Sequence, residues 1–138
     1  MSLEPGDSPG LLLWRVTLHW QRRIAAALAP LGLTHVQFVL LAATWWLNGQ
    51  GEQPNQLALA RFTGTDVKML STVIRTLEAK GLVSRELDPD DTRSKRLRVT
   101  DRGAEVAPGA IAVVEQVDRE FFRPAADAVD VLRRLDQA

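Results

Sequence analysis

The sequence predicts a mainly α fold that carries one small β-hairpin. Apolar residues recur at the spacing of a helix over most of the chain, and the period changes to alternation only after Gly81. With 138 residues and 46% hydrophobic content, the chain can bury one sizeable core and has the size of a single domain. We therefore expect one domain over residues 11–138, after a disordered tail over residues 1–10 that contains several Pro and Gly residues.

The first two helices are delimited by residues that break or cap helices. Apolar side chains recur at helical spacing over residues 11–29, and Pro30 ends that helix. Thr34 is followed three residues later by Gln37, which is the pattern of a capping box and starts a second helix over residues 35–47. The second helix is apolar nearly all round, so it should be central and buried.

A pair of short helices is expected next. Pro54 suits the first position of a helix over residues 55–62, because the N–H that proline lacks has no helical partner there. Residues 63–65 form a turn, and a helix over residues 66–80 follows, with Gly81 just past its end as a C-cap. Two short helices joined by a tight turn make a helix-turn-helix.

A hairpin follows these helices directly. Alternating residues predict strands over residues 83–87 and 96–99, joined by a turn-rich stretch over residues 88–91. A hairpin in this place is the wing of a winged helix-turn-helix.

Two C-terminal helices complete the predicted fold. Thr100 opens a fifth helix that Pro108 should kink, and Pro124 separates it from a last helix. Both helices carry apolar stripes that one small core cannot easily cover: Ile111, Val114, Val117, Phe121 and Phe122, then Val129, Leu132 and Leu135. We therefore expect residues 11–33 and 104–138 to flank the winged helix as dimerisation helices of a homodimer.

Composition and charge exclude several classes of protein. The chain has no cysteine, which removes disulfides, thiolate metal sites and thiol redox sensing. No apolar run approaches the ~20 residues of a membrane span, and we expect a cytoplasmic protein. Lys plus Arg and Asp plus Glu balance at 17 each, but residues 61–102 hold ten basic and seven acidic side chains. Within them, residues 93–98 carry four cations and no anion, a patch that suits nucleic acid.

The helix over residues 66–80 should present a polar face opposite its apolar one. That face and its flanks carry side chains that can read a DNA groove: Lys68, Met69, Ser71, Thr72 and Arg75. The polar members offer donors and acceptors to base edges in a major groove. An ordinary solvated helix face is the alternative interpretation.

The hairpin tip is the second candidate for groove binding, through Arg93, Ser94, Lys95 and Arg96. An exposed guanidinium on a protruding β-ribbon suits a narrow, electronegative minor groove. Asp91 lies two residues before Arg93, and we expect its carboxylate to orient that guanidinium by charge-assisted hydrogen bonds. The alternative is an edge strand that is protected by charges.

Three motifs in order and at fixed spacing carry a resemblance to a known family. They are residues 77–83 (LEAKGLV), 91–93 (DTR) and 97–103 (LRVTDRG). This run resembles the helix-turn-helix and wing of the MarR (multiple antibiotic resistance regulator) family. The resemblance extends, more weakly, from Leu11 to the C-terminus.

The resemblance implies a DNA-binding core and wing over residues 34–103, in which the helix after the turn is the recognition helix and Arg93 enters the minor groove. It implies a sequence-specific transcriptional regulator that binds a palindromic operator in double-stranded DNA as a homodimer, with repression as the family default. The chain departs from the family at Thr63 and Thr65, where apolar residues are common, and at Pro108.

Members of the family often lose DNA affinity when a small aromatic or anionic ligand enters a crevice between the dimerisation helices and the winged helix. The corresponding segments here supply aromatic walls and cations: Trp14, His19, Trp20, Arg23, His35 and Trp45. The alternative is that tryptophans at helical spacing belong to the core, and we expect at least Trp45 or Trp46 to do so.

Neither a cofactor nor an enzymatic activity is expected. Only His19 and His35 could join carboxylates as metal ligands, and the sequence has no glycine-rich phosphate loop and no nucleophile elbow. The alternative function is a winged-helix protein-interaction module without DNA binding, and only the neutral overall charge favours it.

Overall fold

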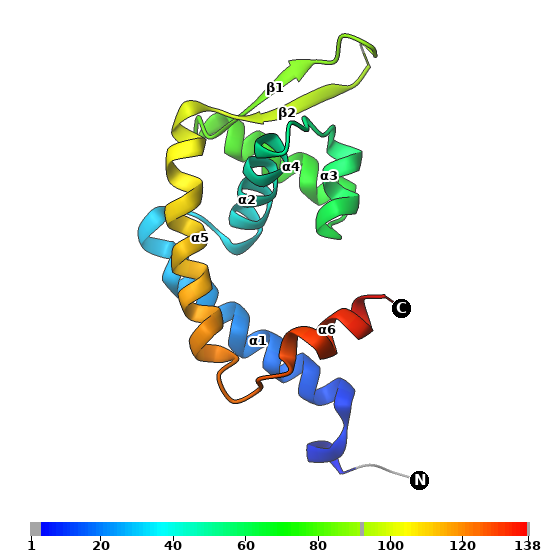
Figure 1. Ribbon diagram of the computed structural model, residues 1–138, viewed down its shortest axis with the longest axis vertical. Helices are drawn as coiled ribbons and strands as arrows, with labels where there is room; N and C mark the ends of the chain where they lie inside the picture. Colours follow the sequence, from blue (N-terminus) through cyan, green and yellow to red (C-terminus); the bar gives the residue numbers. More distant parts are fainter. Residues whose placement is uncertain (1–3, 92, 138) are drawn as a thin grey trace.

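Two parts of different shape make up the structure, a compact lobe and a long helical arm (Figure 1). The computed structural model describes residues 4–91 and 93–137. The elements in chain order are η1 (Pro5–Asp7), α1 (Pro9–Leu28), η2 (Ala29–Leu31), α2 (His35–Gly49), α3 (Gln56–Thr63), α4 (Val67–Ala79), β1 (Val83–Leu87), β2 (Lys95–Val99), α5 (Asp101–Phe121) and α6 (Ala128–Asp136). The lobe contains α2, α3, α4, the hairpin and the start of α5, whereas α1, the rest of α5 and α6 form the arm. The predicted mainly α fold with one hairpin is confirmed.

Helix α1 begins two residues earlier than predicted. The side chain of Ser8 caps it by accepting a hydrogen bond from the N–H of Leu11 at 3.2 Å, and Pro9 occupies the first helical position. The tail predicted over residues 1–10 therefore ends earlier than expected, and residues 1–3 of that tail lie outside the described residues.

Helix α2 starts at the predicted capping box. The N–H of Gln37 donates to the Thr34 hydroxyl, and the N–H of Thr34 donates to the side-chain oxygen of Gln37, both at 3.2 Å. The chain reaches this point through Gly32, whose φ of +69° allows the sharp corner after α1. Helix α2 is central in the lobe, and its buried side chains belong to Gln37, Leu40, Leu41, Ala43, Thr44 and Leu47.

The two tryptophans of α2 are less buried than predicted. Trp45 is half-buried and packs against the core. Trp46 is 50% exposed and stacks on Phe62 of α3, with ring centroids 5.9 Å apart. The helix is apolar on more faces than its neighbours can cover, so one aromatic ring is left at the surface.

Helix α3 starts after Asn55, whose side chain caps it by accepting from the N–H of Ala58 at 2.8 Å. Pro54 therefore does not occupy the first helical position, and that prediction is wrong. The carbonyl of Pro54 accepts a hydrogen bond from the N–H of Leu97 at 2.8 Å, so this residue pairs with the outer edge of β2. Gly64, with a φ of +73°, makes the turn into α4.

Strands β1 and β2 form the predicted antiparallel hairpin, in a register that pairs Val83 with Val99 and Leu87 with Lys95. Its base is fixed to the lobe by Asn48 near the end of α2. The side-chain amide of Asn48 donates to the carbonyl of Leu97 at 3.2 Å, and its oxygen accepts from the N–H of Val99 at 2.9 Å. The hairpin therefore projects from a held base toward a free tip.

Helix α5 runs from the lobe into the arm and passes through Pro108 without interruption. Pro108 is exposed, and the kink predicted at this proline leaves α5 a single helix, which ends before Pro124 as predicted. No single described helix is long and apolar enough to cross a membrane, although α1–η2 and α2 pass such a test when joined across a bend of 73°.

Candidate nucleic-acid interface

Helix α4 has one fully buried face and one exposed polar face. Leu70, Ile74 and Leu77 are all 0% exposed, which fixes the orientation of the helix on the core. The carboxylate of Asp66 caps the N-terminus by accepting from the N–H of Met69 at 3.0 Å. The predicted face carries the exposed side chains of Lys68, Thr72 and Arg75, flanked by Met69, which is 41% exposed, and the half-buried Ser71.

The cations on this face are available to a ligand. Among the described residues, no salt bridge involves Lys68 or Arg75. The hydroxyl of Thr72 donates to the carbonyl of Lys68 at 3.3 Å, a weak contact that leaves the oxygen free to accept. The helix therefore offers two free cations and one acceptor on the face that points away from the lobe.

The turn before α4 explains one departure from the family pattern. The Thr63 hydroxyl donates to the carbonyl of Leu59 at 2.8 Å, and it lies 2.8 Å from the hydroxyl of Thr65. The two hydroxyls satisfy each other beside Gly64, so polar residues fit at positions where apolar ones are common.

Two hydrogen bonds to Asp91 hold the backbone at the tip of the hairpin in a defined turn. The N–H of Arg93 donates to the carboxylate of Asp91 at 3.0 Å, and the N–H of Ser94 donates to the carbonyl of Asp91 at 3.1 Å. The prediction that Asp91 binds the Arg93 guanidinium is therefore wrong, because that carboxylate binds a backbone N–H instead. No ion pair of Arg93 is found in the described part of the chain, and its side chain is exposed. Thr92 lies outside the described residues.

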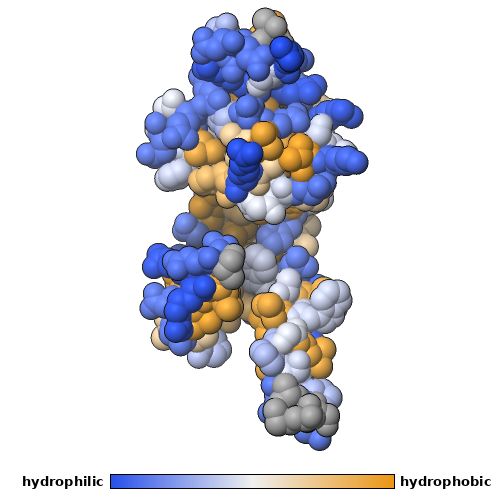
Figure 2. All heavy atoms as spheres, turned by 90° about the vertical axis from the view of Figure 1, so that its right-hand side faces the viewer, coloured by the Kyte–Doolittle hydropathy of each residue, from blue (hydrophilic) through white to orange (hydrophobic). Residues whose placement is uncertain are grey.

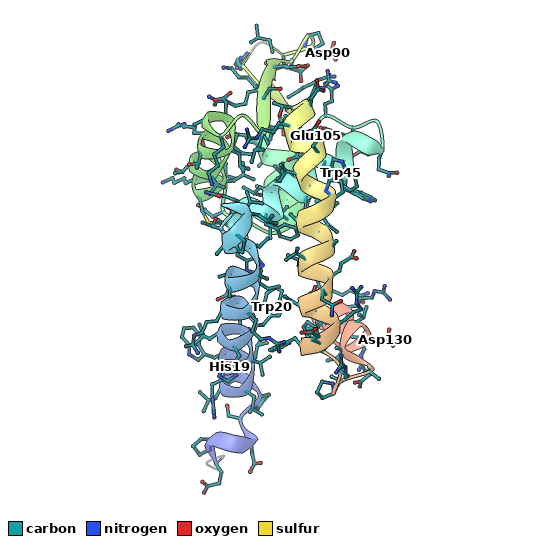
Figure 3. The ribbon with its side chains drawn as sticks, turned by 90° about the vertical axis from the view of Figure 1, so that its left-hand side faces the viewer. His19, Trp20, Trp45, Asp90, Glu105 and Asp130 are labelled. Carbon is teal, nitrogen blue, oxygen red and sulfur yellow. The ribbon has the colours of Figure 1, made fainter. Side chains whose placement is uncertain are left out.

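Arg96 is the guanidinium that the acidic turn holds. It lies 3.2 Å from the carboxylate of Asp88 and 3.4 Å from that of Asp90, at the end of the hairpin (Figure 3). The backbone N–H of Asp90 and then the Arg96 guanidinium hold the pKa of Asp88 below its ordinary value. Of the four predicted tip residues, Arg93 and Lys95 are exposed, whereas Ser94 and Arg96 are half-buried. Arg96 therefore shapes the tip and is less free to bind a ligand than the sequence predicted.

An ion pair that the sequence analysis missed joins α4 to the hairpin. Arg85 of β1 approaches the carboxylate of Glu78 with two nitrogens, at 3.0 and 3.3 Å. The hydrogen bonds from Arg85 are the main reason why the pKa of Glu78 is lowered. The two residues are seven apart and lie in different elements, so neither helical nor strand spacing could have revealed the pair.

A cavity of about 750 Å³ lies in the arm, between α1, the end of α5 and α6. Of the predicted ligand residues only Trp20 lines it. The indole N–H of Trp20 donates to the carboxylate of Asp118 at 2.8 Å, which joins α1 to α5 (Figure 3). Asp118 lines the cavity as well, and the other lining residues are mostly apolar or aromatic, with one arginine in α5 and one just after it: Leu13, Val16, Thr17, Arg119, Phe121, Phe122, Arg123, Ala125, Ala126, Ala128, Val129 and Leu132.

The remaining predicted ligand residues do not converge on one site. Trp14 is 65% exposed, and His19 is also exposed. Arg23 pairs with Glu120 of α5 at 3.4 Å and lies over the ring of Phe121. Trp45 packs against the core of the lobe instead.

His35 contacts Trp20 at the junction of the lobe and the arm. Its ring meets the indole edge to face, with centroids 4.9 Å apart. Burial lowers the pKa of His35, and the nearby Asp118 carboxylate opposes that shift. In the described residues, no group of three or more His, Cys, Asp or Glu side chains could hold a metal ion.

Comparisons with known proteins agree on one family. Residues 33–95 match the sequence profile of the MarR family. The chain is 42% identical over 133 residues to the uncharacterized HTH-type transcriptional regulator YdcH of Bacillus subtilis, which covers 96% of this chain and 90% of that protein. It is 36% identical to the HTH-type transcriptional repressor Rv2887 of Mycobacterium tuberculosis, over 81% of this chain and 78% of the other. Among solved structures, CouR from Rhodococcus jostii RHA1 bound to p-coumaroyl-CoA has a TM-score of 0.80 and 28% identity, covering 99% of this chain and 93% of that one.

Proposed function

This chain belongs to the MarR family of transcriptional regulators, and from that premise we propose that it is a homodimeric repressor that releases its operator when a small molecule binds. The single observation that carries the DNA-binding part is the geometry of α4. Its buried apolar face fixes the helix on the lobe, and its opposite face presents Thr72 with Lys68 and Arg75, for which the described part of the chain holds no ion pair. A regulator of this kind needs no catalytic centre, and in this proposal it acts in the cytoplasm, where it can reach the chromosome.

In this proposal α4 reads bases in the major groove and the hairpin tip contacts the minor groove. Arg93 supports the second contact, because it is exposed at the end of a hairpin whose base is held by Asn48. Lys95 is also exposed and would contact phosphates, whereas Arg96 would act by holding the acidic turn. The DNA-contacting set is otherwise as the sequence predicted: Lys68, Met69, Ser71, Thr72, Arg75, Arg93 and Ser94.

The arm supports the dimer. The apolar side chains of α1 and α6 are exposed on the sides of a hollow between the two helices (Figure 2). They include Leu13 at 56%, Trp14 at 65%, Val129 at 60%, Leu132 at 46% and Leu135 at 61% exposed. Monomeric proteins rarely expose so much apolar surface in one place, and a second copy of the arm would cover it. Two copies of α4 would then face half-sites about 10–11 base pairs apart in an inverted repeat.

The cavity in the arm supports regulation by a ligand. Trp20, Phe121 and Phe122 give it aromatic walls. Arg119 and Arg123 bring two cations against the one carboxylate of Asp118, which the Trp20 indole already engages, so the lining keeps a positive excess that suits a carboxylate. CouR, a structural relative, binds the aromatic thioester p-coumaroyl-CoA. We therefore place a small aromatic or anionic ligand at this cavity, around Trp20, in place of the scattered set that the sequence predicted.

Selection from random-sequence DNA, followed by anisotropy titration of the recovered duplexes, tests the proposal. A recovered inverted repeat bound by one dimer supports it. Replacing Thr72 or Arg75 with Ala should change the preferred bases, whereas Lys95→Ala should weaken all sequences alike and lower the salt slope by about 1. Failure to select any sequence would favour the alternative, a winged-helix module that binds other proteins.

A further inference from the structure

The chain just after α4 is where the arm is attached to the lobe. Lys80, the C-cap of α4, reaches across to the corner that follows α1. Its ammonium donates to the carbonyl of Gly32 at 2.6 Å and to the side-chain oxygen of Gln37 at 2.8 Å. Gly32 ends the α1–η2 segment, and Gln37 is in the first turn of α2. One side chain therefore joins the end of the recognition helix to the end of the first arm helix.

The second arm helix is attached at the next two residues. The Thr100 hydroxyl donates to the carbonyl of Gly81 at 2.6 Å, and the N–H of Thr100 donates to the carbonyl of Leu82 at 3.0 Å. Gly103, in the first turn of α5, lies so close to the carbonyl oxygen of Leu82 that a Cβ at this position would collide with it. Both arm helices therefore meet the chain over residues 80–82, which we call the joint.

The two attachments differ in chemistry. At the joint, α5 is held through backbone groups, one hydroxyl and close packing, whereas the polar link from the joint to the end of α1 is one charged side chain. Away from the joint, Ile24 and Leu28 of α1 are buried in the core. An ammonium that donates to two oxygens makes charge-assisted hydrogen bonds, which are shorter and stronger than neutral ones. Lys80 is also far from the bases, because the 13 residues of α4 separate it from the N-terminal end by roughly 20 Å.

We propose that Lys80 is a positioning residue that fixes the angle between the recognition helix and the arm, and thereby the half-site spacing that the dimer accepts. The proposal rests on the proposed function, since it needs a dimer that reads two half-sites. Adding one base pair between half-sites moves them apart by about 3.4 Å and rotates one by about 35°. A dimer whose lobes are held rigidly on their arms follows that rotation poorly. Loss of the Lys80 contacts removes one of the links between lobe and arm, so that each lobe can tilt further while α5 stays attached.

The test compares the wild type with Lys80→Met, which keeps the aliphatic stem but removes the donors, and with Lys80→Arg, which retains charge and donors. The probes are the inverted repeat that the wild type selects and the same repeat with one base pair added to or removed from its centre. We expect the wild type to lose about tenfold or more in affinity on either change, and Lys80→Met to lose about threefold or less. Lys80→Arg should restore most of the discrimination.

Two further measurements separate positioning from other roles. If Lys80 contacted a phosphate, Lys80→Met would lower the salt slope by about 0.9 and leave the spacing preference intact, and this outcome would overturn the proposal. Unchanged discrimination in Lys80→Met would overturn it too. Gln37→Met removes one acceptor of the same contact and also the capping hydrogen bond from the N–H of Thr34, so circular dichroism checks first that the helix content is kept. It should relax the spacing preference less than Lys80→Met, and the double variant should relax it no further than Lys80→Met alone. A wild type that selects no DNA contradicts the proposed function instead, which keeps the two failures distinct.

Discussion

The lobe has a buried apolar core, whereas the arm buries apolar side chains mainly at the end that meets the lobe, such as Ile24 and Leu28. In the lobe, Leu40, Leu41 and Ile74 are 0% exposed, and the core continues through α3 and the base of the hairpin. Toward the other end of the arm, Trp14 of α1 and Leu135 of α6 are more than 60% exposed although both lie in regular helices. The difference indicates that the lobe holds its own fold, whereas the arm needs a second molecule to complete its packing.

The largest expected effect is in the lobe. Ile74→Ala should lower the free energy of unfolding by about 3–4 kcal/mol, because it leaves a cavity in a fully buried site where α4 meets the core. Thermal and urea unfolding measure the loss. The matched arm variant is Leu135→Ala, which should change dimer dissociation in sedimentation experiments more than it changes unfolding of the lobe. Equal losses of lobe stability in the two variants would contradict the division into lobe and arm.

Removal of α6 should lower the stability of the lobe less than Ile74→Ala does, but it should abolish most of the binding to the operator. Deleting residues 124–138 leaves the lobe core and every proposed DNA contact in place. The arm would lose part of its partner surface, and we expect monomers or aggregates in light scattering. Operator affinity should fall about 100-fold or more, because two linked half-site contacts become separate events. A truncated monomer that binds the operator as tightly as the full chain would refute the dimer.

At the hairpin tip the expected effect is smaller and confined to binding. Arg93→Ala should weaken operator binding several-fold and leave the melting temperature within about 1 °C, because an exposed tip residue supports no core contact. Anisotropy titration and circular dichroism measure the two quantities on the same sample. Arg22→Ala is the control, since Arg22 is exposed on α1 outside every proposed contact. If both variants bind alike, the hairpin tip does not contact DNA.

The smallest expected effect lies where the lobe meets the arm. Burial lowers the pKa of His35 more than Asp118 raises it, so the folded protein holds the imidazole proton less tightly than the unfolded chain does. The contribution of neutral His35 to the free energy of unfolding is therefore fully present above the ordinary histidine pKa of 6.5, and it is lost progressively as the pH falls below that value.

We expect the melting temperature of the wild type to fall between about pH 7.5 and about pH 5.5 by a few degrees more than that of His35→Phe. The phenylalanine keeps a ring against Trp20 but cannot be protonated. A decrease of the same size in both proteins would show that protonation of His35 does not destabilise the folded protein.

The sequence predicted the elements well because most of their signals are local. The Thr34 and Gln37 capping box, the Gly64 turn and the alternation after Gly81 each act within a few residues, and each lies where predicted. Pro54 was misplaced because the partner that decides its role, Leu97, is far away in the chain.

The candidate site was predicted in the same uneven way. The outer face of α4 follows from helical periodicity and one buried face, so Lys68, Thr72 and Arg75 are exposed as predicted, whereas Ser71 at its flank is half-buried. The side-chain partners at the hairpin tip were predicted wrongly, because Asp88, Asp90 and Asp91 all lie within a few residues of the arginines and only the turn geometry decides between them. The ligand residues were scattered because helix spacing does not reveal which helices face one another across a cavity.

Pro108 affects how the two parts of α5 unfold locally. A proline has no N–H, so the carbonyl of Ala104, one turn earlier, loses its helical donor. Both residues are exposed, which lets water take the place of that donor. The proline therefore separates the first turn, which packs under the joint through Gly103, from the later turns that pack on α1. We expect the two segments to open independently, which amide hydrogen exchange would detect as two different degrees of protection. Dimerisation should protect the arm segment, and packing on the lobe should protect the first turn.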